Sequence, residues 1–377
     1  MANSNISALY PEFWFAAFDK LDIGDYNLQN QISRSTESAV AKHGDTVNVP
    51  LMPSLTAADD WTPGDAITAE NVTQSTAQVI LNKSKKKTIS LTATELSLSP
   101  YDLIANYGQA MAKQIAVTVN TDMYLELMKT PNFVDAISAL DEDDIVDART
   151  ALQLNEVSSM NRKLIAGPDD MGQLLKLDAF THANVSGNVE ALEAGKLRNK
   201  FGFEISENTA ISKYTPVDVA GAVDNGAGYV LGDTTMVVKD FNDDANPIRE
   251  GDIFIVAGET GTPYHTVTAT TTTTSDTTGI TFTPALVSSV ADSAVITVTP
   301  TRSILALVPD CAAFAARSYA ELPAGVGVNS SVINWQGLPV RISVWHNQTL
   351  GVNVQFDILY GVKMINTDRI VRILSAV

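Results

Sequence analysis

Residues 99–129 read SPYDLIANYGQAMAKQIAVTVNTDMYLELMK and form the longest uninterrupted helical pattern in the chain. Ser99 is a suitable N-cap, Pro100 occupies the first helical position, and Pro131 cannot continue the helix. At 1.5 Å per residue such a helix would be about 45 Å long, which is more than a compact domain of ordinary size needs. We therefore expect a spine helix that joins separate lobes.

Apolar residues follow this helix in two stripes at helical spacing. The first stripe is Leu103, Tyr107, Met111 and Ile115, and the second is Ala112, Ala116, Val119, Met123 and Leu127. Two apolar faces predict contacts on two sides of the helix.

Composition limits both the architecture and the function. A chain of 377 residues exceeds the usual size of a single core, so about two or three lobes are expected. The formal charge of −18 comes from 43 acidic and 25 basic side chains. Such a surface repels phosphate backbones, so tight or sequence-reading DNA binding is not expected. It suits a protein that must stay soluble at high concentration, or one that lies beside nucleic acid without binding to it.

The residue types that carry catalysis or metals are sparse. Cys311 is the only cysteine, which excludes internal disulfides and thiolate zinc sites. The histidines at 43, 182, 265 and 346 are isolated, and neither an HExxH nor a GxSxG motif occurs. We expect no enzyme activity, no cofactor and no metal. The N-terminus does not read as a secretory signal, no apolar run reaches the ~18 residues of a membrane span, and a cytoplasm is the simplest compartment.

The N-terminal half begins with an arm and a long hairpin. The arm, residues 1–44, carries an aromatic cluster that includes Phe13 and Trp14, which would dock either on its own core or on a neighbouring subunit. Alternating runs at 47–51 and 77–94 enclose a turn-rich stretch with Trp61 near its tip. Residues 45–98 therefore predict an extended hairpin, which buries little by itself and needs a partner surface.

Beyond the spine the pattern becomes mixed. We expect a helix at 141–157 with Ile145, Ala148 and Leu152 on its buried face, a strand at 162–166, and an acid-capped helix after Gly167. The Thr-rich segment 232–302 has turn signals and no helical period, which favours a small all-β module, either open or closed into a barrel. Its strands are expected at 252–257, 265–270, 279–283 and 295–299.

The remaining chain is expected to be mixed α/β at 303–317, followed by closing strands at 338–345, 353–364 and 370–374.

Two charged clusters are candidate subunit contacts. The basic cluster is Lys83, Lys85, Lys86 and Lys87, and the acidic one is Glu142, Asp143 and Asp144. A lysine run on a strand is usually a solvated edge that discourages aggregation. The alternative of similar weight is a positive arm that reaches the acidic helix turn of a neighbouring subunit.

A second acidic stretch has the alternate oxygen spacing of a calcium loop, at Asp240, Asn242, Asp244 and Asn246. Ala245 replaces the required glycine, and Gly251 stands where the bidentate glutamate belongs. An exposed acidic loop is therefore favoured, with Asp243 and Asp244 as candidate interface residues.

Several stretches, taken in this order, resemble the major capsid (coat) proteins of tailed bacteriophages, whose shell fold is shared with herpesvirus capsid floors and bacterial encapsulins. They are RKLIAGP at 162–168, AGKLRNKFGFEI at 194–205 and FDILYGVKMINTDRI at 356–370. IREGDIFIVAG at 248–258 and TFTPAL at 281–286 look like the insertion domain of coat proteins from short-tailed Salmonella-type phages.

The resemblance implies an α+β fold with an N-terminal arm, an extended loop, a spine helix, peripheral and axial domains, and a small all-β insertion domain. In this fold the second apolar stripe of the spine helix should face β elements of the same subunit, and pairing with another helix would contradict the resemblance. The corresponding ranges are 1–44 for the arm, 45–98 for the loop, 99–160 for the spine and peripheral domain, 161–231 and 303–352 for the axial domain, 232–302 for the insertion, and 353–377 for the C-terminal strands of the peripheral domain.

It also implies a function: self-assembly into pentamers and hexamers of an icosahedral head that encloses double-stranded DNA, with a scaffolding protein and a portal as partners. The protein would reside in the virion after assembly in the cytoplasm of a bacterial host. The alternatives are an encapsulin-like compartment shell and, from a different class, a soluble hydrolase or carbohydrate-binding protein with a β appendage. The content of purified particles, nucleic acid or protein, would distinguish a phage head from a compartment shell. A small oligomer with a convergent polar pocket would indicate the hydrolase or carbohydrate-binding protein.

Overall fold

The protein was studied as a computed structural model, and the structure describes most of the chain. The described residues are 26–34, 46–53, 55, 58, 60, 62–64, 69–92, 94–95, 103–136, 140–177, 197, 199–211, 220–240, 248–272, 277–321, 328–335, 337–346 and 351–376.

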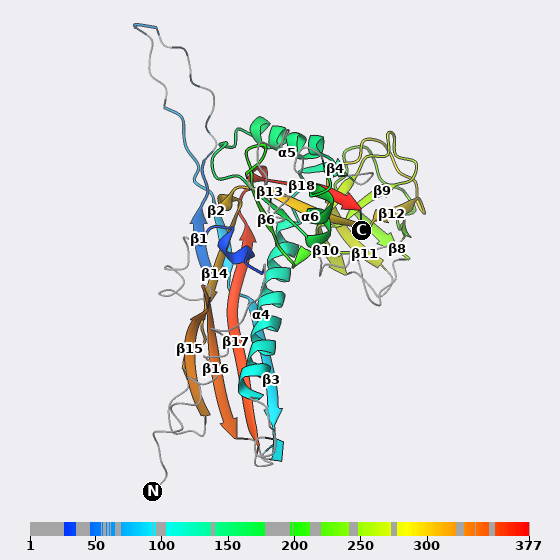
Figure 1. Ribbon diagram of the computed structural model, residues 1–377. Coiled ribbons are helices and arrows are strands. Elements are labelled where there is room, and N and C mark those ends of the chain that lie inside the picture. Colours follow the sequence, from blue (N-terminus) through cyan, green and yellow to red (C-terminus); the bar gives the residue numbers. More distant parts are fainter. Residues whose placement is uncertain are drawn as a thin grey trace.

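The spine helix α4, Leu103–Leu127, packs along a long antiparallel sheet to form one elongated lobe (Figure 1). Its strands are β3 (Lys83–Leu91), β14 (Ala312–Arg317), β15 (Val328–Trp335), β16 (Leu338–His346) and β17 (Val352–Met364). The strand β17 is central: β3 pairs with one of its edges, and β16 and β14 pair in succession with the other.

The core of this lobe confirms the prediction for the second stripe of α4. All five residues of that stripe are buried in one apolar cluster with side chains of β14, β15, β16 and β17, and the cluster contains no residue of another α-helix. In the first stripe Met111 and Ile115 are buried, but Tyr107 is 45% exposed, so this stripe is not fully covered within the subunit. The predicted N-cap at Ser99 lies outside the described residues.

The described part of the N-terminal segment, 26–34, docks on its own subunit. The backbone N–H of Leu28 donates to Asn120 Oδ1 at 2.8 Å, and Asn120 Nδ2 donates to Gln29 Oε1 at 3.2 Å. Asn120 is fully buried in α4, and these bonds satisfy its amide. Phe13 and Trp14 lie outside the described residues.

A second sheet lies at the C-terminal end of α4 (Figure 1). Its strand order is β4 (Phe133–Ala136), β18 (Ile370–Ala376), β13 (Thr301–Leu307), β5 (Lys163–Ala166) and β6 (Glu204–Glu207). The helices α5 (Glu142–Leu154) and α6 (Pro168–Leu174) accompany it. As predicted, Ile145, Ala148 and Leu152 are the buried residues of α5, and both helices carry acidic residues in their first turns.

The Thr-rich segment closes into a barrel. Its strands are β7 (Ala220–Val223), β8 (Thr235–Lys239), β9 (Ile253–Val256), β10 (His265–Thr272), β11 (Thr277–Thr283) and β12 (Val295–Thr299). The interior is filled by apolar side chains that include Phe254, Phe282 and Ile296. The first strand begins at Ala220, before the expected boundary at residue 232, because β7 supplies the edge that β12 and β8 need to close the barrel.

The barrel is held against the second sheet by a buried arginine. Arg372 of β18 donates from Nη1 to the backbone O of Gly251 at 2.7 Å and from Nη2 to Thr266 Oγ1 at 2.9 Å. Gly251 has a φ of +99°, and a Cβ at this position would lie 2.9 Å from Met128 Cβ. A larger residue therefore does not fit here without movement, and Gly251 permits the close approach of the barrel to the end of α4.

The expectation of mixed α/β structure at 303–317 is wrong. The segment forms β13 and β14, joined by a short 3₁₀ turn at Pro309–Cys311. The alanines of β14 face two cores: Ala313 and Ala315 contact the hairpin described below, whereas Ala312 and Ala316 face the core under α4. Small side chains are needed because β14 is covered on both sides, and this requirement overrides their helix propensity.

Candidate subunit-assembly surfaces

The hairpin formed by β1 (Thr46–Pro50) and β2 (Thr76–Ile80) stands out from the body of the subunit (Figure 1). Its base is anchored by Val47, Val79 and Leu81, which pack on β14. The backbone comes very close to β17 as well: a Cβ on Gly361 would lie 2.2 Å from the O of Ile80. Only glycine fits at this position, so the base of the hairpin is fixed to the sheet.

Beyond the base, the described residues between β1 and β2 expose apolar side chains. Met52 is 89% exposed, Leu55 59% and Val72 53%. A two-stranded ribbon has little core of its own, and exposed apolar side chains gain free energy when another surface covers them. This region therefore has the properties of a segment that lies on a partner. Trp61, predicted near its tip, lies outside the described residues.

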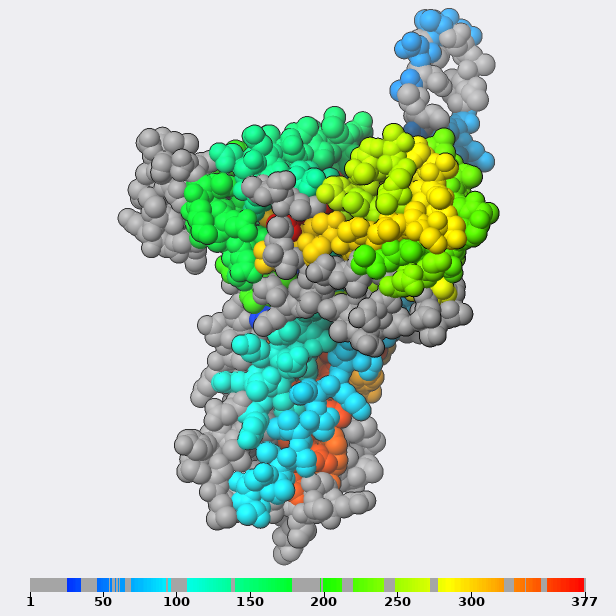
Figure 2. All heavy atoms as spheres, turned by 90° about the vertical axis from the view of Figure 1, so that its right-hand side faces the viewer, coloured from blue at the N-terminus to red at the C-terminus, as the bar shows by residue number. Residues whose placement is uncertain are grey.

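The predicted hairpin was too long, because β3 does not belong to it. The strand β3 pairs with β17 from Lys83↔Tyr360 to Leu91↔Val352 and so becomes an edge of the long sheet. Two of the four candidate lysines are thereby placed against α4, which lies beside β3 (Figure 2). The short break at 81–82 separates the two pairing partners, and no periodicity in the sequence marks it.

Lys83 and Lys85 have an ion-pair partner in their own subunit. Their Nζ atoms lie 3.6 and 3.2 Å from Asp122 Oδ2. The same oxygen accepts the hydroxyl of Tyr360 at 2.6 Å, and burial together with this carboxylate raises the pKa of Tyr360. Asp122 thus pairs with two of the four lysines in the cluster. Lys86 and Lys87 are exposed, and within the described part of the chain they have no ion pair.

The acidic cluster also divides into two parts. Asp144 forms a capping box with the N-cap residue Asp141: its Oδ2 accepts the backbone N–H of Asp141 at 2.9 Å. Partial burial raises the pKa of Asp144. Glu142 and Asp143 make no ion pair among the described residues, so their charges remain available. No ion pair joins the lysine cluster to the acidic cluster within the described subunit.

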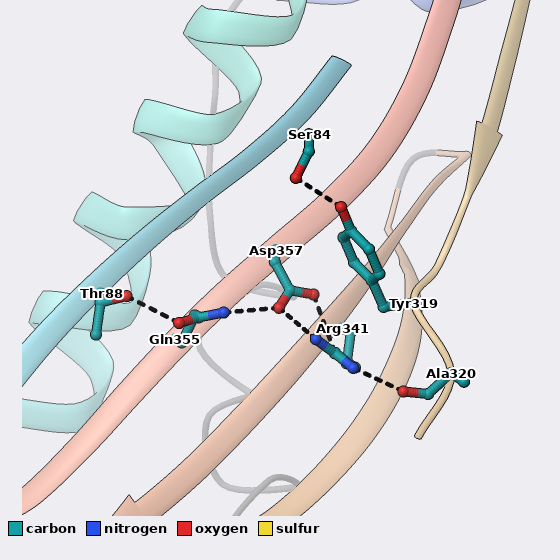
Figure 3. Close-up of polar contacts among 7 residues, drawn as sticks. All are labelled: Ser84, Thr88, Tyr319, Ala320, Arg341, Gln355 and Asp357. Carbon is teal, nitrogen blue, oxygen red and sulfur yellow. Dashed lines mark hydrogen bonds and ion pairs between the residues drawn. The ribbon is translucent and has the colours of Figure 1, made fainter. Parts of the chain in front are cut away.

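A polar network crosses the long sheet on the face opposite α4 (Figure 3). Arg341 of β16 binds Asp357 of β17 with two hydrogen bonds, of 3.1 and 2.8 Å, and donates to the O of Ala320 at 2.7 Å. Gln355 connects Asp357 to Thr88 of β3. Charged bidentate pairs of this kind fix strand positions. The face is therefore rigid and polar, unlike the apolar face under α4.

Two further side chains complete this polar face. Tyr319 donates its hydroxyl to Ser84 of β3 at 2.6 Å, and the guanidinium of Arg341 lies 5.0 Å from the Tyr319 ring centroid (Figure 3). The sequence interpretation missed this network. Its only local signal is the alternation in β17, where Gln355 and Asp357 stand between buried apolar residues.

A charged cleft of about 460 Å³ separates α4 from the barrel. Lys129 at the end of α4 lies 2.7 Å from Glu126 Oε2 and forms a second ion pair with Glu250 of the barrel segment. These carboxylates raise the pKa of Lys129, although burial acts in the opposite direction. The Lys129–Glu250 ion pair crosses the cleft and connects the barrel segment to the spine.

The remaining candidate chemistry concerns metals and the cysteine. No group of His, Cys, Asp and Glu side chains there could hold a metal ion. Cys311 is fully buried, and burial raises its thiol pKa to about 12, as expected for a small core residue. His43, His182, Asp243 and Asp244 lie outside the described residues. No described helix is long and apolar enough to cross a membrane.

Comparison with known proteins gives the fold. No protein-family model and no curated protein matches the sequence. Among solved structures, a chain from Mycobacterium phage Che8 aligns with a TM-score of 0.54 and 14% identity, over 91% of this chain and 89% of the other. A chain from the capsid structure of cyanophage P-SCSP1u aligns with a TM-score of 0.50 and 10% identity, over 89% and 84%. Nearly the whole chain therefore has the fold of bacteriophage capsid proteins.

Proposed function

We propose that this chain is the major capsid protein of a tailed phage and assembles into the pentamers and hexamers of an icosahedral head enclosing double-stranded DNA. The observation that carries the proposal is the shared capsid fold, which covers 91% and 89% of this chain in the two alignments. A structural role rather than an enzymatic one accords with the scarcity of convergent chemistry in the described residues.

The exposed hairpin supports an assembling subunit. Met52, Leu55 and Val72 expose apolar surface at a site where the chain has no core of its own. Contact with a neighbouring copy would bury that surface, so assembly adds free energy to the folded state by mass action. Symmetric shells repeat one such contact many times.

The net charge of −18 supports enclosure of DNA. An acidic wall repels the phosphate backbone, so packed DNA would not adhere to it. The further partners that the resemblance implies, a scaffolding protein and a portal, belong to this proposal, as do assembly in a bacterial cytoplasm and the specific likeness to Salmonella-type coat proteins.

We propose a subunit contact between the residues of the two charged clusters that have no ion pair in the described part of their own subunit. Lys86 and Lys87 of one copy would meet Glu142 and Asp143 of a neighbouring copy, because these charges have no ion pair in the described part of their own subunit. Phe13, Trp14, Trp61, Asp243 and Asp244 remain interface candidates.

The function is tested by size-exclusion chromatography and negative-stain electron microscopy of the expressed chain. Closed particles or ring-shaped capsomers are expected. A monomer at all concentrations, with no particles, would contradict the proposal. Particles filled with protein cargo rather than nucleic acid would identify a compartment shell instead.

The contact is tested by charge reversal. Lys86→Glu with Lys87→Glu should lower particle yield, Glu142→Lys with Asp143→Lys should do the same, and the combination should restore it. The matched control is Lys83→Glu with Lys85→Glu: these lysines face Asp122, so the acidic-cluster reversal should not rescue them. If the quadruple variant assembles no better than either double variant, the proposed contact between the two clusters is wrong.

A further inference from the structure

The barrel core contains a buried pair of titratable side chains that neither the capsid fold nor the proposed assembly contact uses. His265 is the first residue of β10, and Glu259 lies in the turn between β9 and β10. Their side chains are fully buried, and His265 Nε2 lies 2.7 Å from Glu259 Oε2. A charge is costly at such a site unless it is paired and hydrogen-bonded.

Every polar atom of the pair has a partner. The other ring nitrogen of His265, Nδ1, lies 2.8 Å from the O of Pro284. The other carboxylate oxygen, Glu259 Oε1, accepts the backbone N–H of Val287 at 2.7 Å. The pair thus connects the β9–β10 turn to the segment that follows β11.

These partners determine how many protons the pair holds. A carbonyl oxygen only accepts, so His265 Nδ1 carries a proton and donates it to Pro284. The 2.7 Å contact between Nε2 and Oε2 then needs one more proton between the two atoms, whichever of them carries it. Without that proton, a carboxylate oxygen would face a nitrogen lone pair. With a second one, a neutral acid would place its O–H against an N–H donor.

The surroundings provide no competing partner for this proton. The rings of Phe254 in β9 and Phe282 in β11 flank the imidazole, at centroid distances of 5.4 and 5.1 Å. The charged groups on the packed elements have partners of their own: Asp252 accepts the backbone N–H of Arg249, and Arg372 binds Thr266. Tyr264, beside His265, packs on Phe133.

We propose that His265 and Glu259 share a single proton that joins the β9–β10 turn to residues 284–287, which makes the integrity of this end of the barrel pH-dependent. The contact is weakened on the alkaline side, when the shared proton is lost, and on the acid side, when a second proton is bound. Thr266, the next residue, carries the hydrogen bond to Arg372, so the change extends to the contact between barrel and body. The inference does not depend on the proposed function.

Glu259→Gln provides a sharp test of the alkaline side, because its amide can keep both contacts of Glu259 with a proton that is not lost as the pH rises. Its amide nitrogen can donate to Nε2 of a neutral His265, and its oxygen can accept from Val287. The full-length wild type and variant are compared by hydrogen exchange of peptides covering 284–290, corrected for intrinsic rates, across a pH series. Wild-type protection should fall roughly tenfold or more on the alkaline side of its optimum, as expected for loss of a hydrogen bond to a charged group, and protection in E259Q should stay flat on that side.

Asp224→Asn is the matched control, since Asp224 forms an exposed ion pair with Lys239, at 3.4 Å, in the same barrel. This variant should keep the wild-type pH dependence. Parallel profiles for wild type and E259Q would overturn the proposal. So would a wild-type profile without pH dependence at 284–290, a measurement that requires no substitution to fold.

Discussion

The spine lobe and the barrel place charge in opposite ways. In the spine lobe the ion pairs flank the apolar cluster under α4: Lys83, Lys85 and Asp122 are 31%, 39% and 17% exposed, and the Arg341–Asp357 pair lies on the opposite face of the sheet. In the barrel, the side chains of His265 and Glu259 are fully buried and form a hydrogen bond with each other. A long helix on a sheet buries enough apolar surface to be stable without an ion pair between them, whereas a small barrel fixes its end turn with a proton.

The largest effect is expected from a charge in the spine core. Val119→Asp would bury an unpaired carboxylate at a fully buried position, at a cost of several kcal/mol, which is comparable with the whole stability of a domain. We expect no soluble, folded subunit, as measured by expression yield and circular dichroism. Gln114→Asp, on the exposed side of α4, is the control and should fold. Wild-type particle yield from V119D would show that the stripe is not a core.

Removal of the arginine between the barrel and the second sheet should have the next largest effect. Arg372→Met leaves the O of Gly251 and the hydroxyl of Thr266 without their buried donor, at a cost of about 3 kcal/mol. The barrel should then become sensitive to limited proteolysis before the spine lobe does. Arg317→Met, at an exposed strand end, serves as the control. Simultaneous digestion of both regions in R372M would mean that they unfold as one unit.

A pH-dependent difference is expected in the second sheet, where Asp170 is fully buried beside Ser375. Burial raises its pKa, so the ionised form is disfavoured in the folded protein. Its contribution to stability is present below the ordinary aspartate pKa of about 3.9 and is lost as the pH rises through the raised value. Asp170→Asn should therefore gain stability relative to wild type as the pH rises towards neutrality.

Urea unfolding of D170N and wild type at several pH values measures this difference. Asp169→Asn alters the neighbouring carboxylate, which is 62% exposed and pairs with Arg302, and it should show no such trend. A D170N advantage that grows on acidification would reverse the sign and contradict the interpretation.

The smallest effects are expected at the rim of the spine lobe. Lys85→Ala loses a partly exposed ion pair with Asp122 and should cost at most about 1 kcal/mol, while Lys86→Ala should stay within about 0.5 kcal/mol. The difference should shrink at high salt, because ions screen exposed pairs. If K86A destabilises the isolated subunit more than K85A does, Lys86 has an intramolecular role and is a poor candidate for a subunit contact.

Regular elements could be predicted wherever local pattern and tertiary role agree. The expected strand at 295–299 coincides with β12, and the acid-capped helix at 141–157 appears as α5 with its capping box. The prediction for the alanine-rich segment that forms β14 failed because the local preference of alanine is helical. The cores on both sides of β14 require small side chains in a strand. Such a demand arises only from neighbours that are distant in sequence.

The candidate surfaces were predicted in part. The sequence identified the lysine cluster but could not distinguish its paired members from its exposed ones. Lys83 and Lys85 meet Asp122 only because β3 pairs with β17. His265 was recognised only as isolated along the chain. Its partner Glu259 is close in sequence, but the sequence around it resembles an ordinary hairpin turn. Only the fold shows that both side chains are buried in contact with each other.

The position of β17 has a mechanical consequence. The hairpin continues through residues 81–82 into β3, and β3 is bonded to β17 along its whole length. A pull on the hairpin from outside would act along β3, so the hydrogen bonds between β3 and β17 would be loaded together in shear rather than opened one after another. On its other side, β17 passes the load to β16 and β14. The hairpin and the long sheet thus resist tension as one unit. A force applied to the hairpin is distributed over the hydrogen bonds of the long sheet.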